Sequence, residues 1–165
     1  MNRTFSWLFL VVFLTFVQAQ SLAQKMSGPD MTFDEVDGSV SKLSEYLRVG
    51  PVYLSFWALW CEPCKQELRA LKGLYKDGEE KPYTILAINL DSPKSLAKVK
   101  AYVKSQTYPF PVVLDPNQQV FQNFNGQNLP FSVLLDKTGK VLTTHAGYYV
   151  GDEVQIEKEI MKAVR

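Results

Sequence analysis

Histidine and cysteine are scarce in this 165-residue chain, which contains one histidine and two cysteines. A structural zinc site needs about four ligands, so Cys61, Cys64 and His145 are too few to form one, and we expect His145 to be an ordinary strand or loop residue. Neither charge is in excess, with 18 basic and 17 acidic residues. This balance argues against a nucleic-acid or anionic-membrane surface, because both partners select for basic proteins.

A long hydrophobic run is also missing at the N-terminus. The apolar run Trp7–Val17 is shorter than the ~20 residues that usually span a bilayer, and no cysteine follows it that would carry a lipid. Arg3 precedes the run and small residues end it, which is the pattern of a secretory signal peptide. We predict a signal peptide at residues 1–19, with cleavage there or as late as residue 23, and a periplasmic or otherwise extracytoplasmic location. The alternative is an uncleaved N-terminal membrane anchor.

Residues 20–30 are polar and contain Gly28-Pro29, which predicts a flexible leader before one folded domain at residues 31–165. In this domain, apolar runs of strand length alternate with apolar residues at helical spacing. The alternation predicts an α/β fold with a mixed central sheet and helices on both faces. The expected strands are an N-terminal β-hairpin at 31–40 with its turn at Asp37-Gly38, single strands at 51–56, 83–90 and 112–114, and a second hairpin formed by 131–135 and 140–144. The expected helices are a short one capped by Ser44, others starting at Pro63 and Asp91, one or two turns at 120–124, and a last helix at 152–164.

Cys61 and Cys64 lie where the strand at 51–56 gives way to a helix. A disulfide across two residues constrains the unfolded chain little, so reversible redox chemistry explains this pair better than structural cross-linking. A helix N-terminus offers unpaired N–H groups and partial positive charge, both of which favour a thiolate. We therefore expect Cys61, ahead of the helix, to be the exposed nucleophile and Cys64, in its first turn, to be the resolving thiol.

The segment Phe56–Lys65 has aromatic residues before the first cysteine and a lysine after the second. It resembles the active-site segment of the thioredoxin superfamily, and Pro130 stands where that family has a cis-proline. The resemblance covers about residues 30–165 and looks most like the extracytoplasmic TlpA/ResA-like thiol–disulfide oxidoreductases, one branch of which serves cytochrome c maturation. It implies a thioredoxin-like fold with an inserted strand-helix segment between Thr84 and Asp115.

The same resemblance implies the roles of the site residues. Cys61, Cys64 and Glu67 are the expected catalytic residues, and the Cys61–Cys64 disulfide is the redox-active group, with no other cofactor and no metal. The residues expected to bind substrate are Trp60, Glu62, Pro63, Leu129 and Pro130. We expect Glu62 to be exposed, so that its charge partly opposes a thiolate at Cys61.

Glu67 follows Cys64 by three residues, so both side chains share one helix face. A carboxyl held there away from water is expected to have a raised pKa and to shuttle a proton. The alternative is a solvated carboxylate paired with a nearby lysine. Ser55 favours the first reading, because thioredoxins proper carry a buried aspartate at that place, six residues before the first cysteine. Phe131 also departs from the family, in which threonine often follows the cis-proline.

The predicted reaction is the reduction of disulfides in client proteins, with re-reduction by a membrane-bound thiol electron donor. One rival keeps the chemistry and makes the protein a disulfide donor. Another is a redox-inert binding module on the same fold, since fold alone does not decide function. A peroxidase of the peroxiredoxin type is disfavoured because the Thr-x-x-Cys pattern is absent. We expect a monomer.

Overall fold

The computed structural model describes residues 31–75 and 80–165. The predicted signal peptide at 1–19 and leader at 20–30 lie outside the described residues. Among the described residues, no helix is long and apolar enough to cross a membrane. The strands are β1 Thr32–Glu35, β2 Val40–Lys42, β3 Val52–Trp57, β4 Thr84–Asn89, β5 Val112–Leu114, β6 Phe131–Leu135 and β7 Val141–Ala146. The helices are α2 Leu43–Leu47, α3 Glu62–Gly73, the 3₁₀ turn η2 Pro93–Ser95, α4 Leu96–Gln106, α5 Gln119–Asn123 and α6 Asp152–Val164.

The strands form one mixed seven-stranded sheet in the order β2-β1-β5-β4-β3-β6-β7. β3 runs parallel to β4, and β4 runs parallel to β5, whereas the remaining neighbours are antiparallel. The inserted segment between Thr84 and Asp115 supplies β4, η2, α4 and β5. The predicted mixed sheet and thioredoxin-like fold are therefore confirmed.

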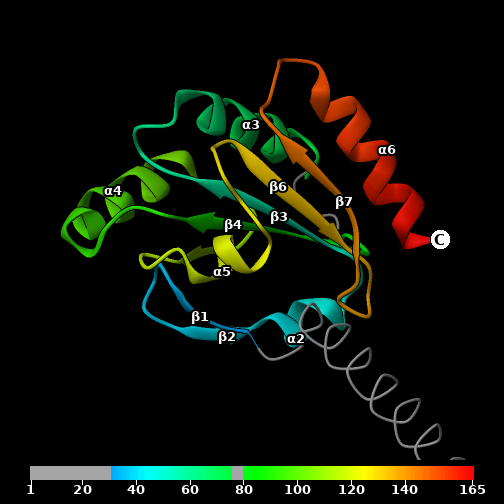
Figure 1. The fold of residues 1–165 in the computed structure, drawn as a ribbon, viewed down its shortest axis with the longest axis horizontal. Coiled ribbons are helices and arrows are strands. Elements are labelled where there is room, and N and C mark those ends of the chain that lie inside the picture. The colour runs from blue at the N-terminus through cyan, green and yellow to red at the C-terminus, as the bar shows by residue number, and fades with distance from the viewer. Residues whose placement is uncertain (1–30, 76–79) are drawn as a thin grey trace, which may run out of the picture.

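Helices cover both faces of the sheet, as Figure 1 shows with α3 and α6 on one side and α2 and α5 on the other. Alternate residues of the fully buried strand β3 serve the two cores. Tyr53 and Trp57 belong to the apolar cluster under α3, α4 and α6. Leu54 and Phe56 belong to the cluster under α2 and α5. Because β3 lies between β4 and β6 in the sheet, the loop that follows β3 starts from a strand with a hydrogen-bonded neighbour on each side.

Two predicted helix starts are wrong in detail. Ser44 does not cap its helix, because α2 already begins at Leu43 with Lys42 as the N-cap residue, and the Glu45 carboxylate accepts the hydrogen bond from the Lys42 N–H at 3.2 Å. The helix expected from Asp91 instead begins with the 3₁₀ turn η2, and the Ser92 side chain makes no capping bond.

Candidate redox site

Cys61 is the N-cap residue of α3, directly after the loop that leaves β3. Its sulfur is bonded to that of Cys64 at 2.04 Å and accepts a hydrogen bond from the Cys64 backbone N–H at 3.3 Å. The expectation that Cys61 is exposed is wrong for this disulfide form, since its side chain turns back onto the helix and only 4% of the residue is exposed, against 0% for Cys64. Cys61 remains the more exposed of the two residues.

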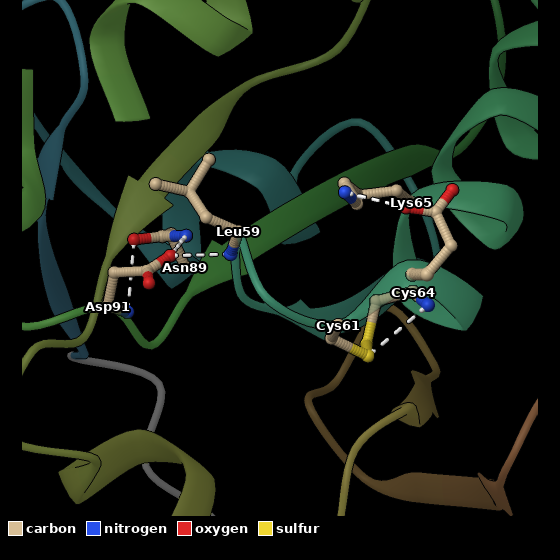
Figure 2. Close-up of a disulfide and its surroundings, with 7 residues drawn as sticks. Leu59, Cys61, Cys64, Lys65, Asn89 and Asp91 are labelled. Carbon is tan, nitrogen blue, oxygen red and sulfur yellow. Dashed lines mark hydrogen bonds and ion pairs between the residues drawn. A yellow bond between two sulfur atoms is a disulfide. The ribbon is translucent and has the colours of Figure 1, made fainter. Parts of the chain in front are cut away.

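The loop ahead of Cys61 is fastened to the end of β4, an arrangement that the sequence analysis missed. The Asp91 carboxylate accepts hydrogen bonds from the backbone N–H of Leu59 and from the Asn89 amide, both at 2.8 Å. Within the loop, the Cys61 N–H donates to the Ala58 carbonyl at 3.0 Å. Figure 2 shows Asp91 at one end of this loop and the disulfide at the other. Asp91 stands in a sequence pattern typical of a helix start, and this pattern contains no sign of its hydrogen bond to the distant Leu59.

Trp60 and Glu62 flank Cys61 on the surface. Trp60 is 74% exposed, as a residue that meets a client would be. Glu62 is exposed as predicted, but its charge is not isolated, because it forms ion pairs with Lys65 at 2.7 Å and Arg69 at 3.1 Å. Hydrogen bonds from these two cations lower the pKa of Glu62. Two cations therefore accompany the Glu62 charge beside Cys61. The expectation that this charge partly opposes a thiolate at Cys61 stays a prediction.

The peptide bond between Leu129 and Pro130 is cis, as predicted from the position of this proline. Pro130 directly precedes β6, whose first residue, Phe131, pairs with Phe56 near the end of β3. The cis bond therefore lies at the same end of the sheet as the loop that carries the cysteines. The Pro130 carbonyl accepts a hydrogen bond from the Gly147 N–H at 2.8 Å.

Glu67 is buried on α3, with 2% of the residue exposed. The Tyr53 hydroxyl donates to its Oε1 at 3.1 Å, and Tyr53 lies 2.6 Å from the Ser132 hydroxyl. Its Oε2 has no hydrogen-bond partner among the described residues. Burial raises the pKa of Glu67 from 4.5 to about 7, with the Tyr53 hydrogen bond acting in the opposite direction. The alternative reading of a solvated carboxylate paired with lysine is wrong.

A cavity of about 360 Å³ lies between β7 and α6, and Glu67, Ser132, Tyr148 and Asp152 are among the residues that line it. The buried carboxyl therefore borders a space that is separate from the exposed surface around Trp60. His145 lies on β7, as expected for a strand residue, and its Nε2 is 2.8 Å from the Glu159 carboxylate. Within residues 31–75 and 80–165, no group of three or more His, Cys, Asp or Glu side chains is arranged to hold a metal ion.

The disulfide at the start of α3 and the cis-proline before β6 agree with the proteins that this chain resembles. Residues 25–144 match the AhpC/TSA family. Among curated proteins, the thiol-disulfide oxidoreductase ResA of Geobacillus kaustophilus is 30% identical over 147 residues, which cover 89% of this chain and 83% of that protein. ResA of Bacillus subtilis is 32% identical over 132 residues, covering 80% of this chain and 72% of the relative.

Solved structures show the same similarity. A Chlorobium tepidum protein described as a thiol:disulfide interchange protein DsbE has a TM-score of 0.74 and 30% identity, over 84% of this chain and 96% of its own. The exposed lipoprotein thioredoxin Etrx1 of Streptococcus pneumoniae has a TM-score of 0.65 and 30% identity, over 79% of this chain and 98% of its own. The chain therefore belongs to the AhpC/TSA family of thioredoxin-like proteins and, within it, to the ResA-like thiol–disulfide oxidoreductases.

Proposed function

We propose that this protein reduces disulfide bonds in client proteins outside the cytoplasm, with Cys61 as nucleophile, Cys64 as resolving thiol and Glu67 as the group that exchanges their protons. The observation that carries the proposal is the burial of the Glu67 carboxyl one helical turn after Cys64. A redox-inert cross-link would need no such group, because a carboxyl is costly to bury without a role.

The reaction begins with the reduced pair. The Cys61 thiolate attacks one sulfur of the client disulfide, so that a Cys61–client bond forms, the client S–S bond breaks, and the leaving client thiolate takes up a proton. Cys64 then loses its proton to Glu67, and its thiolate attacks the Cys61 sulfur. The Cys61–Cys64 bond forms, the mixed disulfide breaks, and the second client thiolate is released and protonated. The client gains two electrons and two protons. The cysteine pair supplies both electrons and the Cys64 proton, which Glu67 passes on to a leaving client thiolate, and solvent supplies the second proton because it took up the Cys61 proton when the thiolate formed.

The surface around Cys61 suits a protein substrate. Trp60 presents an exposed aromatic ring beside the nucleophile, and aromatic side chains are common anchors of protein interfaces. Leu129 and Pro130 directly precede β6, whose first residue pairs with Phe56 near the end of β3. Glu62 and Pro63 lie in the first turn of α3. We propose that these five residues form the client groove, in which an extended segment lies against the backbone at Pro130.

The direction of electron flow depends on the reduction potential, because a group that exchanges protons speeds the forward and reverse reactions equally. Strong oxidants stabilise the thiolate of their reduced form. Here the Cys61 sulfur accepts one backbone hydrogen bond, from Cys64, and the nearby cations Lys65 and Arg69 are engaged by Glu62. This moderate stabilisation supports a reductase. The signal-peptide pattern of residues 1–19 supports export, and an oxidising compartment would require re-reduction by a membrane-bound thiol donor.

Equilibration with glutathione tests the direction. We expect a potential near the −270 mV or so of thioredoxin, well below the roughly −120 mV of a strong oxidant. The Cys61–Cys64 disulfide should then persist in millimolar reduced glutathione and should be reduced by dithiothreitol, as followed by alkylation and mass spectrometry. Ready reduction by glutathione would instead identify a disulfide donor. A reduced protein that fails to reduce insulin disulfides would indicate an inert module.

A further inference from the structure

The two oxygens of the Glu67 carboxyl have different surroundings. Oε1 accepts a hydrogen bond from the Tyr53 hydroxyl, whereas Oε2 has no partner among the described residues although it is buried. Ser55 Oγ, on the same face of β3 as Tyr53, is also buried without a hydrogen-bond partner in this part of the chain. The Ser55 and Ser132 hydroxyls also lower the pKa of Glu67 as hydrogen-bonding groups, so both lie near the carboxyl. Among the described residues, however, the hydrogen bond that the carboxyl forms is the one from Tyr53 to Oε1.

The Tyr53 hydroxyl is itself held in place. A phenol has a single hydrogen to donate, so while Tyr53 donates to the carboxylate of Glu67, the Ser132 hydroxyl, 2.6 Å away, donates to Tyr53. Tyr53 lies on β3 and Ser132 on the neighbouring strand β6. The orientation of the carboxyl is thus fixed by two adjacent strands of the central sheet, both fully buried.

We propose that Tyr53 is a positioning residue for the redox reaction: its hydroxyl, held by Ser132, fixes Oε1 of Glu67 and leaves Oε2 as the oxygen that exchanges a proton with Cys64. The proposal rests on the proposed function, in which Glu67 takes the proton from Cys64. It adds the group that orients this carboxyl and that stabilises its ionised form through a hydrogen bond. Ser132 also lines the cavity between β7 and α6.

Other titratable groups surround the carboxyl and bear on its pH dependence. The Asp152 charge on α6 raises the pKa of Glu67. The charge of Glu159, on the same helix, acts on Tyr53, and Glu159 is paired with His145 of β7. Tyr148, after β7, lines the same cavity. These groups stay in place when Tyr53 is changed to Phe, so the variant isolates the effect of one hydroxyl.

The test uses the reduced protein and a chromogenic aryl disulfide, 5,5′-dithiobis(2-nitrobenzoic acid). Attack by Cys61 releases one thionitrobenzoate, and attack by Cys64 on the mixed disulfide releases the second, so stopped-flow absorbance separates the two steps. In Tyr53→Phe the carboxylate loses a hydrogen bond, and we expect the pH midpoint of the second step to rise by about one unit. At pH 7 this second step should become up to about tenfold slower, while the first step keeps its rate.

Tyr46→Phe is the matched control. Its hydroxyl also lies near a carboxylate and a serine, Glu35 at 2.8 Å and Ser41 at 2.7 Å, but its ring packs in the opposite core. This variant should keep the wild-type pH profile. Ser132→Ala should move the midpoint in the same direction as Tyr53→Phe by a smaller amount, and it serves as the test if Tyr53→Phe does not fold.

The double variant Tyr53→Phe, Glu67→Gln separates this inference from the proposed function. Glu67→Gln should abolish the pH step, and Tyr53→Phe should then add no further change. A wild-type profile in Tyr53→Phe, or an equal slowing in both backgrounds, would overturn the positioning role while Glu67 keeps its own. An unchanged profile in Glu67→Gln would overturn the proton exchange assigned to Glu67, and this inference with it, whereas the reduction of client disulfides is decided separately by the glutathione and insulin experiments.

Discussion

The Asp91 carboxylate and the backbone N–H of Leu59 are joined by a 2.8 Å hydrogen bond, which fastens the loop before Cys61 to the end of β4. The same carboxylate oxygen accepts from the Asn89 amide, so the loop is tied to a strand that is buried along its whole length. The carbonyl of Trp57 also accepts a hydrogen bond from the Leu90 N–H at 2.9 Å. The loop that carries Cys61 is therefore attached to the sheet by side-chain and backbone hydrogen bonds together.

We predict that Asp91→Ala lowers the free energy of unfolding by about 1–3 kcal/mol, because hydrogen bonds to a charged group are lost in a half-buried setting. The reduction of insulin should slow as well, since the loop that carries Trp60 and Cys61 loses its attachment. Urea unfolding and turbidity assays measure the two effects. Asp91→Asn retains an acceptor oxygen and should recover most of both.

Asp136→Ala provides a control for this prediction. Asp136 accepts a comparable backbone hydrogen bond, from Thr138 at 2.8 Å, but it follows β6, at the opposite end of that strand from Pro130. Its loss should affect stability without slowing the redox reaction. If Asp91→Ala also reduces insulin at the wild-type rate, the loop does not depend on Asp91 for its position.

The two cysteines should differ in reactivity once reduced. Cys61 caps α3 and its sulfur receives the Cys64 N–H, so we predict that iodoacetamide at neutral pH modifies Cys61 first. Cys61→Ser should abolish insulin reduction, and Cys64→Ser should accumulate mixed disulfides with clients, visible on non-reducing gels. Preferential trapping by Cys61→Ser would reverse the assigned roles.

Trp60 should matter for protein clients and not for small disulfides. We predict that Trp60→Ala lowers kcat/KM for a protein disulfide by about 5–30-fold, the loss expected for an aromatic anchor, and leaves the reaction of Cys61 with a small aryl disulfide unchanged. Val49→Ala is the control, because Val49 is also exposed, at 57%, but lies before β3 rather than after it. If both variants lower kcat/KM for the protein disulfide equally, Trp60 does not contact the client.

Much of the fold was predictable because its signals are local. The apolar runs at 51–56 and 83–90 have strand length and correspond to the fully buried strands β3 and β4. The helical spacing of residues 152–164 corresponds to α6 with the same bounds. The hairpin predicted at 31–40 is also found, with its turn at Asp37-Gly38, where Gly38 has the positive φ of 101° that such a turn favours.

The site was predictable only as far as its local pattern reached. Spacing placed Glu67 on the helix face of Cys64, but its partners Tyr53 and Ser132 come from two strands whose adjacency depends on the order of the whole sheet. Asp91 had the local signal of a helix start, and a tertiary bond to Leu59 determined its role instead. A helical turn does begin just after Asp91, at Pro93, but the Asp91 carboxylate binds the Leu59 N–H of a distant loop instead of capping that turn.

The burial of Glu67 also makes the stability of the oxidised protein depend on pH. Its pKa rises from 4.5 to about 7 on folding because burial disfavours the charged form. The folded state therefore keeps a proton that the unfolded chain has already released between these two values. By linkage, the contribution of Glu67 to stability is fully present below pH 4.5 and is lost as the pH rises through about 7. At about 1.4 kcal/mol per pKa unit, the loss is on the order of 3 kcal/mol.

Glu67→Gln should remove this dependence, because the amide does not titrate. We predict that the free energy of unfolding of the variant, relative to wild type, increases by on the order of 3 kcal/mol between pH 4.5 and pH 8. Urea unfolding of the oxidised proteins across this range measures the difference, in which the titration of all other groups cancels. Glu157→Gln, an exposed position on α6, should show no such trend. A constant difference between wild type and Glu67→Gln would mean that the carboxyl reaches solvent in the folded protein and titrates near its ordinary value, and such a carboxyl would be poorly matched to exchanging protons with Cys64 at neutral pH.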